Sequence, residues 1–209
     1  MHRLVMLSAT YRQDSQHPEI DAMAKRDPAV RSLWRAKVRR LAGDQLRDAM
    51  LAVSGELTDK DSGRGIEGDP GCRSVFVKHL RNVPDEMLKS FDGPDMFSSC
   101  SKRYVSTTAL QSLLLMNSDF AVECSQHFAQ RLLDEAGPQT DDQIALAWKL
   151  AFSTKPTAVD ITAGAKFVEL QQTTIRQQSP KADDATIRRR AMATFCQALL
   201  SSNRFLYVD

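Results

Sequence analysis

The sequence predicts a mainly α-helical protein, with a helical bundle in its C-terminal half and a small two-stranded β element in its N-terminal half. After residue 106, apolar residues recur at spacings of three and four, the period of one helix face. Capping residues stand where these segments start. The stretch 74–80 (SVFVKHL) is rich in β-branched and aromatic residues, which is typical of a strand.

The N-terminal half is expected to alternate short helices with loops. Apolar residues at positions 4, 5 and 7 indicate a first short helix, and Pro18 and Pro28 frame about two further helical turns. An extended piece within 33–41 should lead into a helix over 44–54 that ends at Gly55, and it is expected to pair with the strand at 74–80. Loops are predicted at 58–74 and 91–108, with a short helix between them that starts at Pro84.

Five helices are predicted in the C-terminal half, each from its own start signal. The expected N-terminal residues are Thr107 or Thr108, Ser118, Thr140, Thr157 with Asp160, and Asp183 or Asp184. Two apolar stripes with a four-residue spacing should face the core. They are Phe120, Cys124, Phe128 and Leu132, and then Ile187, Ala191, Phe195 and Leu199; in the helix between them we expect Ile144, Trp148, Ala151 and Phe152 to face inward.

Length and composition limit the classes of protein that the chain can belong to. Its 209 residues, 42% of them hydrophobic, suit a single domain over 1–209, with sub-regions 1–105 and 106–209. No apolar run is long enough to predict a membrane helix. The four cysteines, Cys72, Cys100, Cys124 and Cys196, stand far apart without a CxxC motif, so their redox state stays open and no metal is predicted.

The stretch Arg31 to Leu51 concentrates basic charge, because six basic and two acidic residues give it +4 in a chain of net charge +2. One hypothesis is nucleic-acid binding through phosphates. Trp34, Val38, Leu41 and Leu46 interleave with the arginines, and carboxylates lie nearby. We therefore favour a partly buried scaffold of paired guanidinium groups. The consecutive residues 188–190 (RRR) fan around a helix and are interpreted as a solvated surface.

The loop from Phe91 to Thr108 holds the candidate ligand-binding residues, together with the helix start that follows it. They are Asp92, Asp95, Arg103 and Gln111. Two carboxylates three positions apart could bind a cation or act as acid and base, and an anion could bind at the helix start. The favoured interpretation is a turn in which the aspartates cap backbone N–H groups. Cys124 and His127 share a helix face, but two residues are too few for zinc, so core packing is expected there.

Several segments together resemble a known family. They are SATYRQ (8–13), LWR (33–35), RRL (39–41), LRDAMLAVSG (46–55), RSVFV (73–77), FDGPD (91–95), SC (99–100), TTALQSLLLMNSDF (107–120) and SSNRFLYVD (201–209). Their order and spacing resemble the domain of unknown function at the C-terminal end of large planctomycete proteins, which often also carry a cytochrome-c-like domain. The resemblance implies that this chain is an N-terminally shortened copy of that domain. Ala42 and Gly43 depart from the family pattern, where a capping residue is expected, and so does the 58–74 loop.

From this resemblance we expect a non-catalytic interaction or scaffold module of an exported, cytochrome-associated envelope protein. Its expected partners are upstream domains of the full-length protein or another envelope protein, without nucleic acid. The chain itself is expected to carry no cofactor, since the resemblance places haem c on a separate upstream domain. Two alternatives stay open, namely a hydrolase or redox-linked enzyme whose site an upstream region completes, and nucleic-acid binding through residues 31–51.

Overall fold

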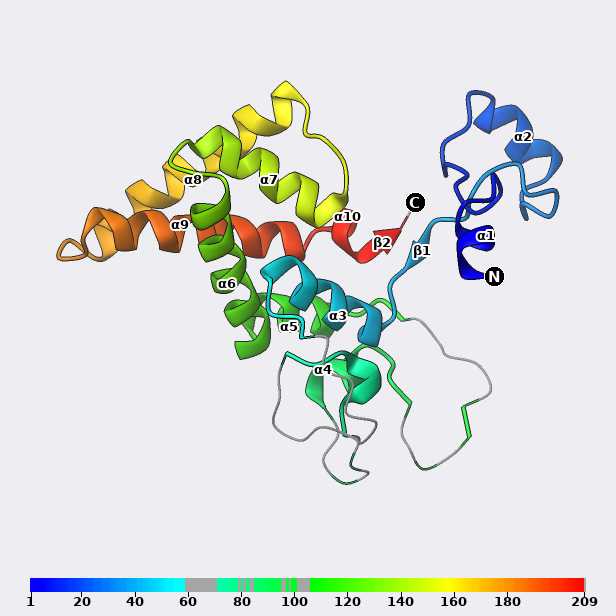
Figure 1. Ribbon diagram of the computed structural model, residues 1–209, viewed down its shortest axis with the longest axis horizontal. Coiled ribbons are helices and arrows are strands. Elements are labelled where there is room, and N and C mark those ends of the chain that lie inside the picture. Colours follow the sequence, from blue (N-terminus) through cyan, green and yellow to red (C-terminus); the bar gives the residue numbers. More distant parts are fainter. Residues whose placement is uncertain are drawn as a thin grey trace. The chain divides into compact units, whose positions relative to one another are not determined.

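The computed structural model describes residues 1–58, 71–78, 80, 82, 85–94, 97, 99–100 and 106–208 (Figure 1). Within these residues the fold is mainly α-helical with one two-stranded sheet, as the sequence predicts. The elements are α1 (His2–Met6), α2 (Ile20–Arg26), β1 (Arg39–Arg40), α3 (Gly43–Ser54), the 3-10 helix η1 (Ser74–Phe76), α4 (Glu86–Ser90), α5 (Ala109–Asn117), α6 (Asp119–Glu135), α7 (Thr140–Phe152), α8 (Ala158–Gln178), α9 (Asp184–Leu200), α10 (Asn203–Leu206) and β2 (Tyr207–Val208).

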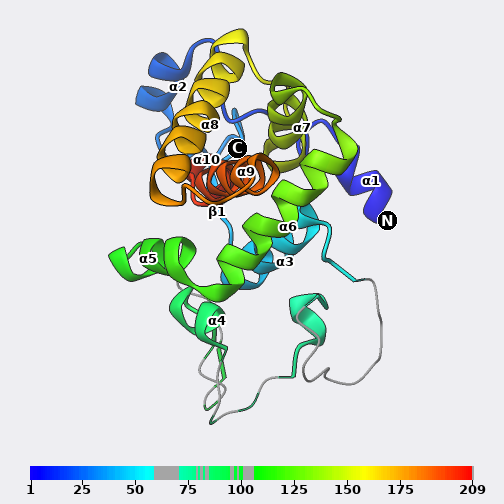
Figure 2. The same ribbon diagram turned by 90° about the vertical axis from the view of Figure 1, so that its left-hand side faces the viewer.

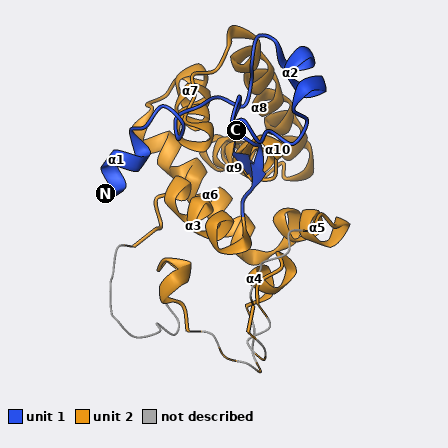
Figure 3. Cartoon of the chain, turned by 90° about the vertical axis from the view of Figure 1, so that its right-hand side faces the viewer, with its two compact units in different colours: residues 1–41, 207–209 blue, residues 42–206 orange. Residues whose placement is uncertain are grey.

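The chain forms two compact units, which Figure 3 shows in different colours. The first unit comprises Met1–Leu41 with Tyr207–Asp209, and the second comprises Ala42–Leu206. The prediction of a single domain over 1–209 stays a prediction.

In the first unit, α1 and α2 lie near the surface and bury no side chain completely. Val30 and Trp34 are buried instead, and the Trp34 indole N–H donates to the Asp27 carbonyl oxygen at 3.1 Å. The His17 ring meets the Trp34 ring edge to face, with 5.7 Å between centroids. The antiparallel sheet pairs Arg39 with Val208 and Arg40 with Tyr207.

The strand predicted at 74–80 is wrong, and so is its pairing with the extended piece. Ser74–Phe76 is a 3-10 helix, and β1 pairs with the far end of the chain. The Ser74 backbone N–H donates to Asp48 Oδ1 at 2.7 Å, so a side chain of α3 takes the donor that a sheet ladder would use. β-branched and aromatic residues favour a strand when they can pack on a half-buried pleated sheet. This segment lies against helix α3 instead, so its β propensity does not decide its structure.

The second unit is organised around α9. Helix α6 crosses α9, and helix α8 packs against it (Figures 1 and 2). The two predicted stripes are confirmed at the centre of this packing. Cys124, Phe128 and Leu132 of α6 are buried, as are Ile187, Ala191, Phe195 and Leu199 of α9. Phe120 is half-buried at the end of its stripe. Burial of these side chains is the main stabilising term of the unit.

Of the four residues of α7 predicted to face inward, Ile144 is fully buried and the others are half-buried, the largest of these being Trp148. Its ring meets Phe152 edge to face, with 5.0 Å between centroids. The Arg204 guanidinium lies 5.6 Å from the Trp148 centroid and 5.0 Å from that of Phe152. The two aromatic rings thus hold a cation from α10 at the rim of the core.

Helix starts follow the predicted caps with two corrections. Thr108, Ser118, Thr157 and Asp183 each accept from a backbone N–H of the helix that follows. Thr140 is the first residue of α7, and its cap position is held by Gln139. At α3 the missing cap is replaced by Gln45, whose Oε1 accepts from the Ala42 N–H at 3.1 Å. Gly43 fits there because a Cβ atom would lie 2.8 Å from the Phe91 Cβ.

Candidate functional site

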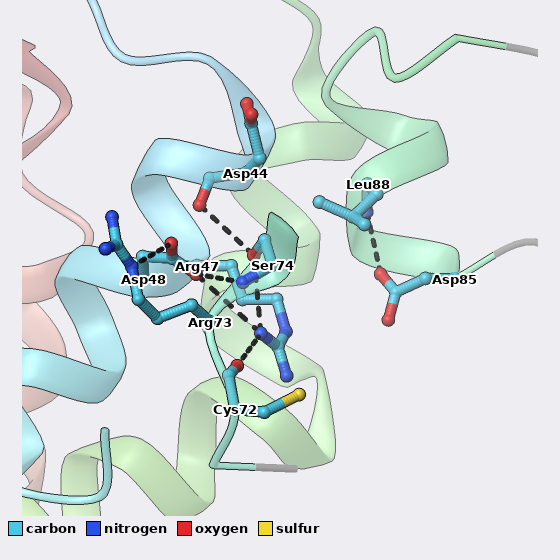
Figure 4. A network of polar contacts seen from close by, with 8 residues as sticks. All are labelled: Asp44, Arg47, Asp48, Cys72, Arg73, Ser74, Asp85 and Leu88. Carbon is cyan, nitrogen blue, oxygen red and sulfur yellow. Dashed lines mark hydrogen bonds and ion pairs between the residues drawn. The ribbon is translucent and has the colours of Figure 1, made fainter. Parts of the chain in front are cut away.

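Arg47 and Asp48 of α3 form a clamp on the segment 72–74, here called the α3 clamp (Figure 4). The side chain of Arg47 is buried, and its NH1 group donates to the Cys72 carbonyl at 2.8 Å and to Ser74 Oγ at 3.3 Å. Ser74 Oγ donates in turn to the Asp44 carbonyl at 3.3 Å. Because these groups satisfy one another, the clamp joins two segments of the chain and offers little to a ligand.

The other arginines of the 31–51 stretch lie in different environments. Arg31 and Arg39 are exposed. Arg35 is half-buried, with its guanidinium 5.0 Å from the centroid of the Trp34 ring. Arg47 fits the predicted scaffold role, since its NH1 group donates to the Cys72 carbonyl at 2.8 Å and lies 3.8 Å from Asp48 Oδ1. Residues 31–41 belong to the first compact unit and residues 42–51 to the second. The +4 stretch is therefore not one surface of a single unit.

Asp92 and Gln111, two of the four candidate ligand-binding residues, meet at Ser106. The Ser106 backbone N–H donates to Asp92 Oδ2 at 2.6 Å, and its hydroxyl lies 2.8 Å from Asp92 Oδ1. Gln111 is buried, and its Nε2 donates to the Ser90 carbonyl at 2.9 Å and to Ser106 Oγ at 3.2 Å. These bonds tie the end of α4 to the start of α5. Asp95 and Arg103 lie outside the described residues, so their convergence with Asp92 stays a prediction.

Cys124 and His127 point into different surroundings. Cys124 is buried, and loss of hydration raises the pKa of its thiol to about 11. His127 is half exposed, with Nδ1 at 3.5 Å from Glu56 Oε1. The described part of the chain holds no group of three or more histidine, cysteine or acidic residues that could bind a metal ion. Core packing is thus confirmed for Cys124 and wrong for His127, which is exposed.

A groove of about 810 Å³ lies between α6, α8 and α9, and we call it the polar groove. Five glutamines contribute to its lining, together with Arg189, Arg190 and His127. The glutamines are Gln126, Gln130, Gln171, Gln178 and Gln197. The sequence did not predict this groove, because 188–190 were interpreted as a solvated surface and the glutamines were not identified as candidates. The sequence pattern that could have predicted it is the spacing of Gln126 with Gln130 and of Gln171 with Gln178, because each pair lies on one helix face.

A smaller cavity of about 530 Å³ lies beside the C-terminal end of α3. Arg131 of α6 lines it and donates to the Ala52 and Val53 carbonyls at 3.1 and 3.0 Å. Its Nε also donates to Glu135 Oε1 at 2.8 Å. The guanidinium thus caps a helix C-terminus, where carbonyl groups lack partners within the helix.

Helix α5 presents an apolar face to solvent, which we call the α5 face. Leu110, Leu113 and Met116 are 59%, 52% and 57% exposed, and they share one side of the helix at spacings of three. Its sequence, ALQSLLLMN, contains no charged residue. On the opposite side Gln111 and Leu115 are buried. Figure 2 shows α5 joining α6 at the N-terminal end of α6.

The fold and these surfaces define a mainly helical domain in which the buried side chains of Arg47 and Gln111 connect separate segments of the chain. Residues 1–168 match the family described as PSD1, protein of unknown function (DUF1553), and the chain belongs to this family. No curated protein and no solved structure matches the sequence. Among the described residues, no helix has the length and apolar character needed to cross a membrane. The predicted resemblance to a domain of unknown function is therefore confirmed.

Proposed function

We propose that the chain is a non-catalytic interaction module of an exported, cytochrome-associated envelope protein, and that the α5 face is its docking surface. The observation that carries the proposal is the exposure of three large apolar side chains on a helix without charge. Contiguous exposed apolar residues mark interaction sites more often than isolated ones do.

The α5 helix is held firmly enough to act as a docking surface. At its start, Thr108 and Gln111 form a reciprocal capping box. At its end, Gln197 Nε2 donates to the Met116 carbonyl at 2.7 Å, and Ser201 Oγ donates to the Leu115 carbonyl at 3.4 Å. A helix fixed at both ends loses little conformational freedom when a partner binds.

The small size of the α5 face favours a partner in the same polypeptide. Three side chains cover much less than the roughly 800 Å² per partner of a standard interface between separate proteins. Interfaces between domains of one chain can be smaller, because the linker keeps the effective concentration high. We therefore propose that the α5 face binds a cytochrome-c-like domain of the same polypeptide.

The test measures binding of the purified chain to a separately expressed cytochrome-c-like domain by biolayer interferometry. The variant L110K/L113K places two charges on the α5 face and should weaken binding about tenfold or more, because burying an unpaired charge is costly. The matched control is V159K, which adds a charge at the exposed Val159 of α8. Absence of binding by the parent chain, or equal binding by parent and L110K/L113K, would refute the proposal.

A further inference from the structure

The polar groove has hydrogen-bonding side chains without partners inside the protein. Within the described residues, the side chains of Gln126, Gln171 and Gln178 make no hydrogen bond to another residue. Gln130 and Gln197 are already engaged, by Asp134 at 2.9 Å and by the Met116 carbonyl. Each unengaged carboxamide offers two donors and one acceptor to whatever enters the groove.

The charge of the groove is positive. Its lining contains Arg189, Arg190 and His127 but, within the described part of the chain, no aspartate or glutamate. His127 Nδ1 lies 3.5 Å from Glu56 Oε1, whereas the Arg190 guanidinium donates to the Ser179 hydroxyl at 3.5 Å. Among the described residues, no carboxylate forms an ion pair with Arg189 or Arg190. Hydrogen bonds from Thr186, and after them the nearby charge of Arg189, lower the pKa of Asp183. Two guanidinium groups are thus available to a carboxylate ligand, for which their planar fork is suited.

The length and floor of the groove suit an extended chain. Its lining on α9 runs from Thr186 to Gln197, which is roughly 16 Å along a helix. That length accommodates about five residues of extended peptide. The lining of the groove also includes the small side chains of Ser125, Ala193 and Thr194. The backbone of a bound peptide can therefore approach the groove closely.

The amide lining distinguishes a peptide from a sugar. A carboxamide can donate to a peptide carbonyl and accept from a peptide N–H at the same time. The described lining has no phenylalanine, tyrosine or tryptophan ring on which a sugar could stack. We infer that the polar groove binds an extended acidic peptide segment, with Gln126, Gln171 and Gln178 pairing with its backbone and Arg189 and Arg190 receiving its carboxylates.

Fluorescence polarisation tests the inference with a labelled peptide of alternating glutamate and alanine, about seven residues long so that it overhangs the groove. The parent chain should bind it saturably, and added salt should weaken binding because part of the attraction is between charges. The variant R189Q/R190Q should lose about tenfold or more in affinity. The variant Q171A/Q178A should also bind more weakly while its salt dependence stays as in the parent chain.

The matched control is K166Q/R176Q, which removes two positive charges from α8 outside the groove lining. It should bind like the parent chain. A loss equal to that of R189Q/R190Q would show that only net charge matters and would overturn the inference. Equal binding of a glutamine–alanine peptide, or tighter binding of an oligogalacturonate, would overturn it as well. So would no saturable binding up to about 1 mM peptide.

This test is independent of the α5 face, since none of the varied residues lies on α5. Folding of each variant is checked by circular dichroism and by its thermal midpoint. A folded R189Q/R190Q protein that binds the acidic peptide like the parent chain would refute the groove assignment and leave the proposed docking surface untouched.

Discussion

The α3 clamp and the polar groove both depend on arginines, yet they use them in opposite ways. Arg47 is 6% exposed and is satisfied by the Cys72 carbonyl and the Ser74 hydroxyl. Arg189 and Arg190 are exposed and form no ion pair with a carboxylate among the described residues, although the charge of Arg189 acts on nearby Asp183. The same side chain therefore stabilises the fold in one place and is available for recognition in the other.

This difference shows that local charge density in a sequence does not identify a binding surface. The +4 stretch at 31–51 contains the most deeply buried of these arginines, whereas the groove arginines come from a run that the sequence analysis took as plain surface. Whether the guanidinium donors are already bound by the protein distinguishes the two cases.

The largest expected effect is that of R47M, which keeps the apolar stem but removes the donors. The Cys72 carbonyl then loses its charged partner inside the protein, so the free energy of unfolding should fall by about 3 kcal/mol. Urea denaturation measures this change. The control R189M should change it by less than about 0.5 kcal/mol. Similar losses in both variants would show that the clamp and the groove arginines do not differ in their role.

An intermediate effect is expected for R131M. The guanidinium of Arg131 caps two carbonyls of α3, but its side chain is partly exposed, so water can replace it in part. The free energy of unfolding should fall by about 1 kcal/mol. E135Q removes the ion-pair charge while leaving the carbonyl contacts, and it should cost less than about 0.5 kcal/mol because exposed pairs contribute little. A larger loss in E135Q than in R131M would contradict this assignment.

A smaller effect is expected for R189Q/R190Q on stability. Both side chains are exposed, so the free energy of unfolding should change by less than about 0.5 kcal/mol. Thermal or urea unfolding checks this value. A loss comparable to that of R47M would mean that the groove arginines are structural, and the comparison of the two regions would no longer hold.

The smallest expected effect is confined to acid pH, where titration of Asp27 in the first unit should change the thermal stability. Hydrogen bonds from the Ser32 hydroxyl and N–H, at 2.6 and 2.8 Å, lower the pKa of Asp27 from 3.8 to about 2. A lowered pKa in the folded state adds stability above pH 3.8, and this contribution disappears as the pH falls from 3.8 towards 2. D27N should flatten the fall of Tm in this window, and S32A should do the same. An unchanged slope in both variants would contradict the assignment.

Much of the second unit was predictable because helices are local structures. The spacing of Phe128 with Leu132 and of Ile187 with Phe195 identified the buried faces, and Thr157 and Asp183 identified two helix starts. The strand at 74–80 was wrong because Asp48 takes the Ser74 N–H, a contact between residues that are distant in sequence. The groove was missed because its amides come from three helices whose packing no local pattern records.

By itself the sequence determined the helical class, the two stripes of the core and most of the caps, since these depend on spacings of three or four residues within one segment. Tertiary structure alone decided which strand pairs with β1, which arginine is buried, and which polar side chains face one groove. These outcomes depend on contacts between residues far apart in the chain, where burial and unsatisfied hydrogen bonds outweigh local preference.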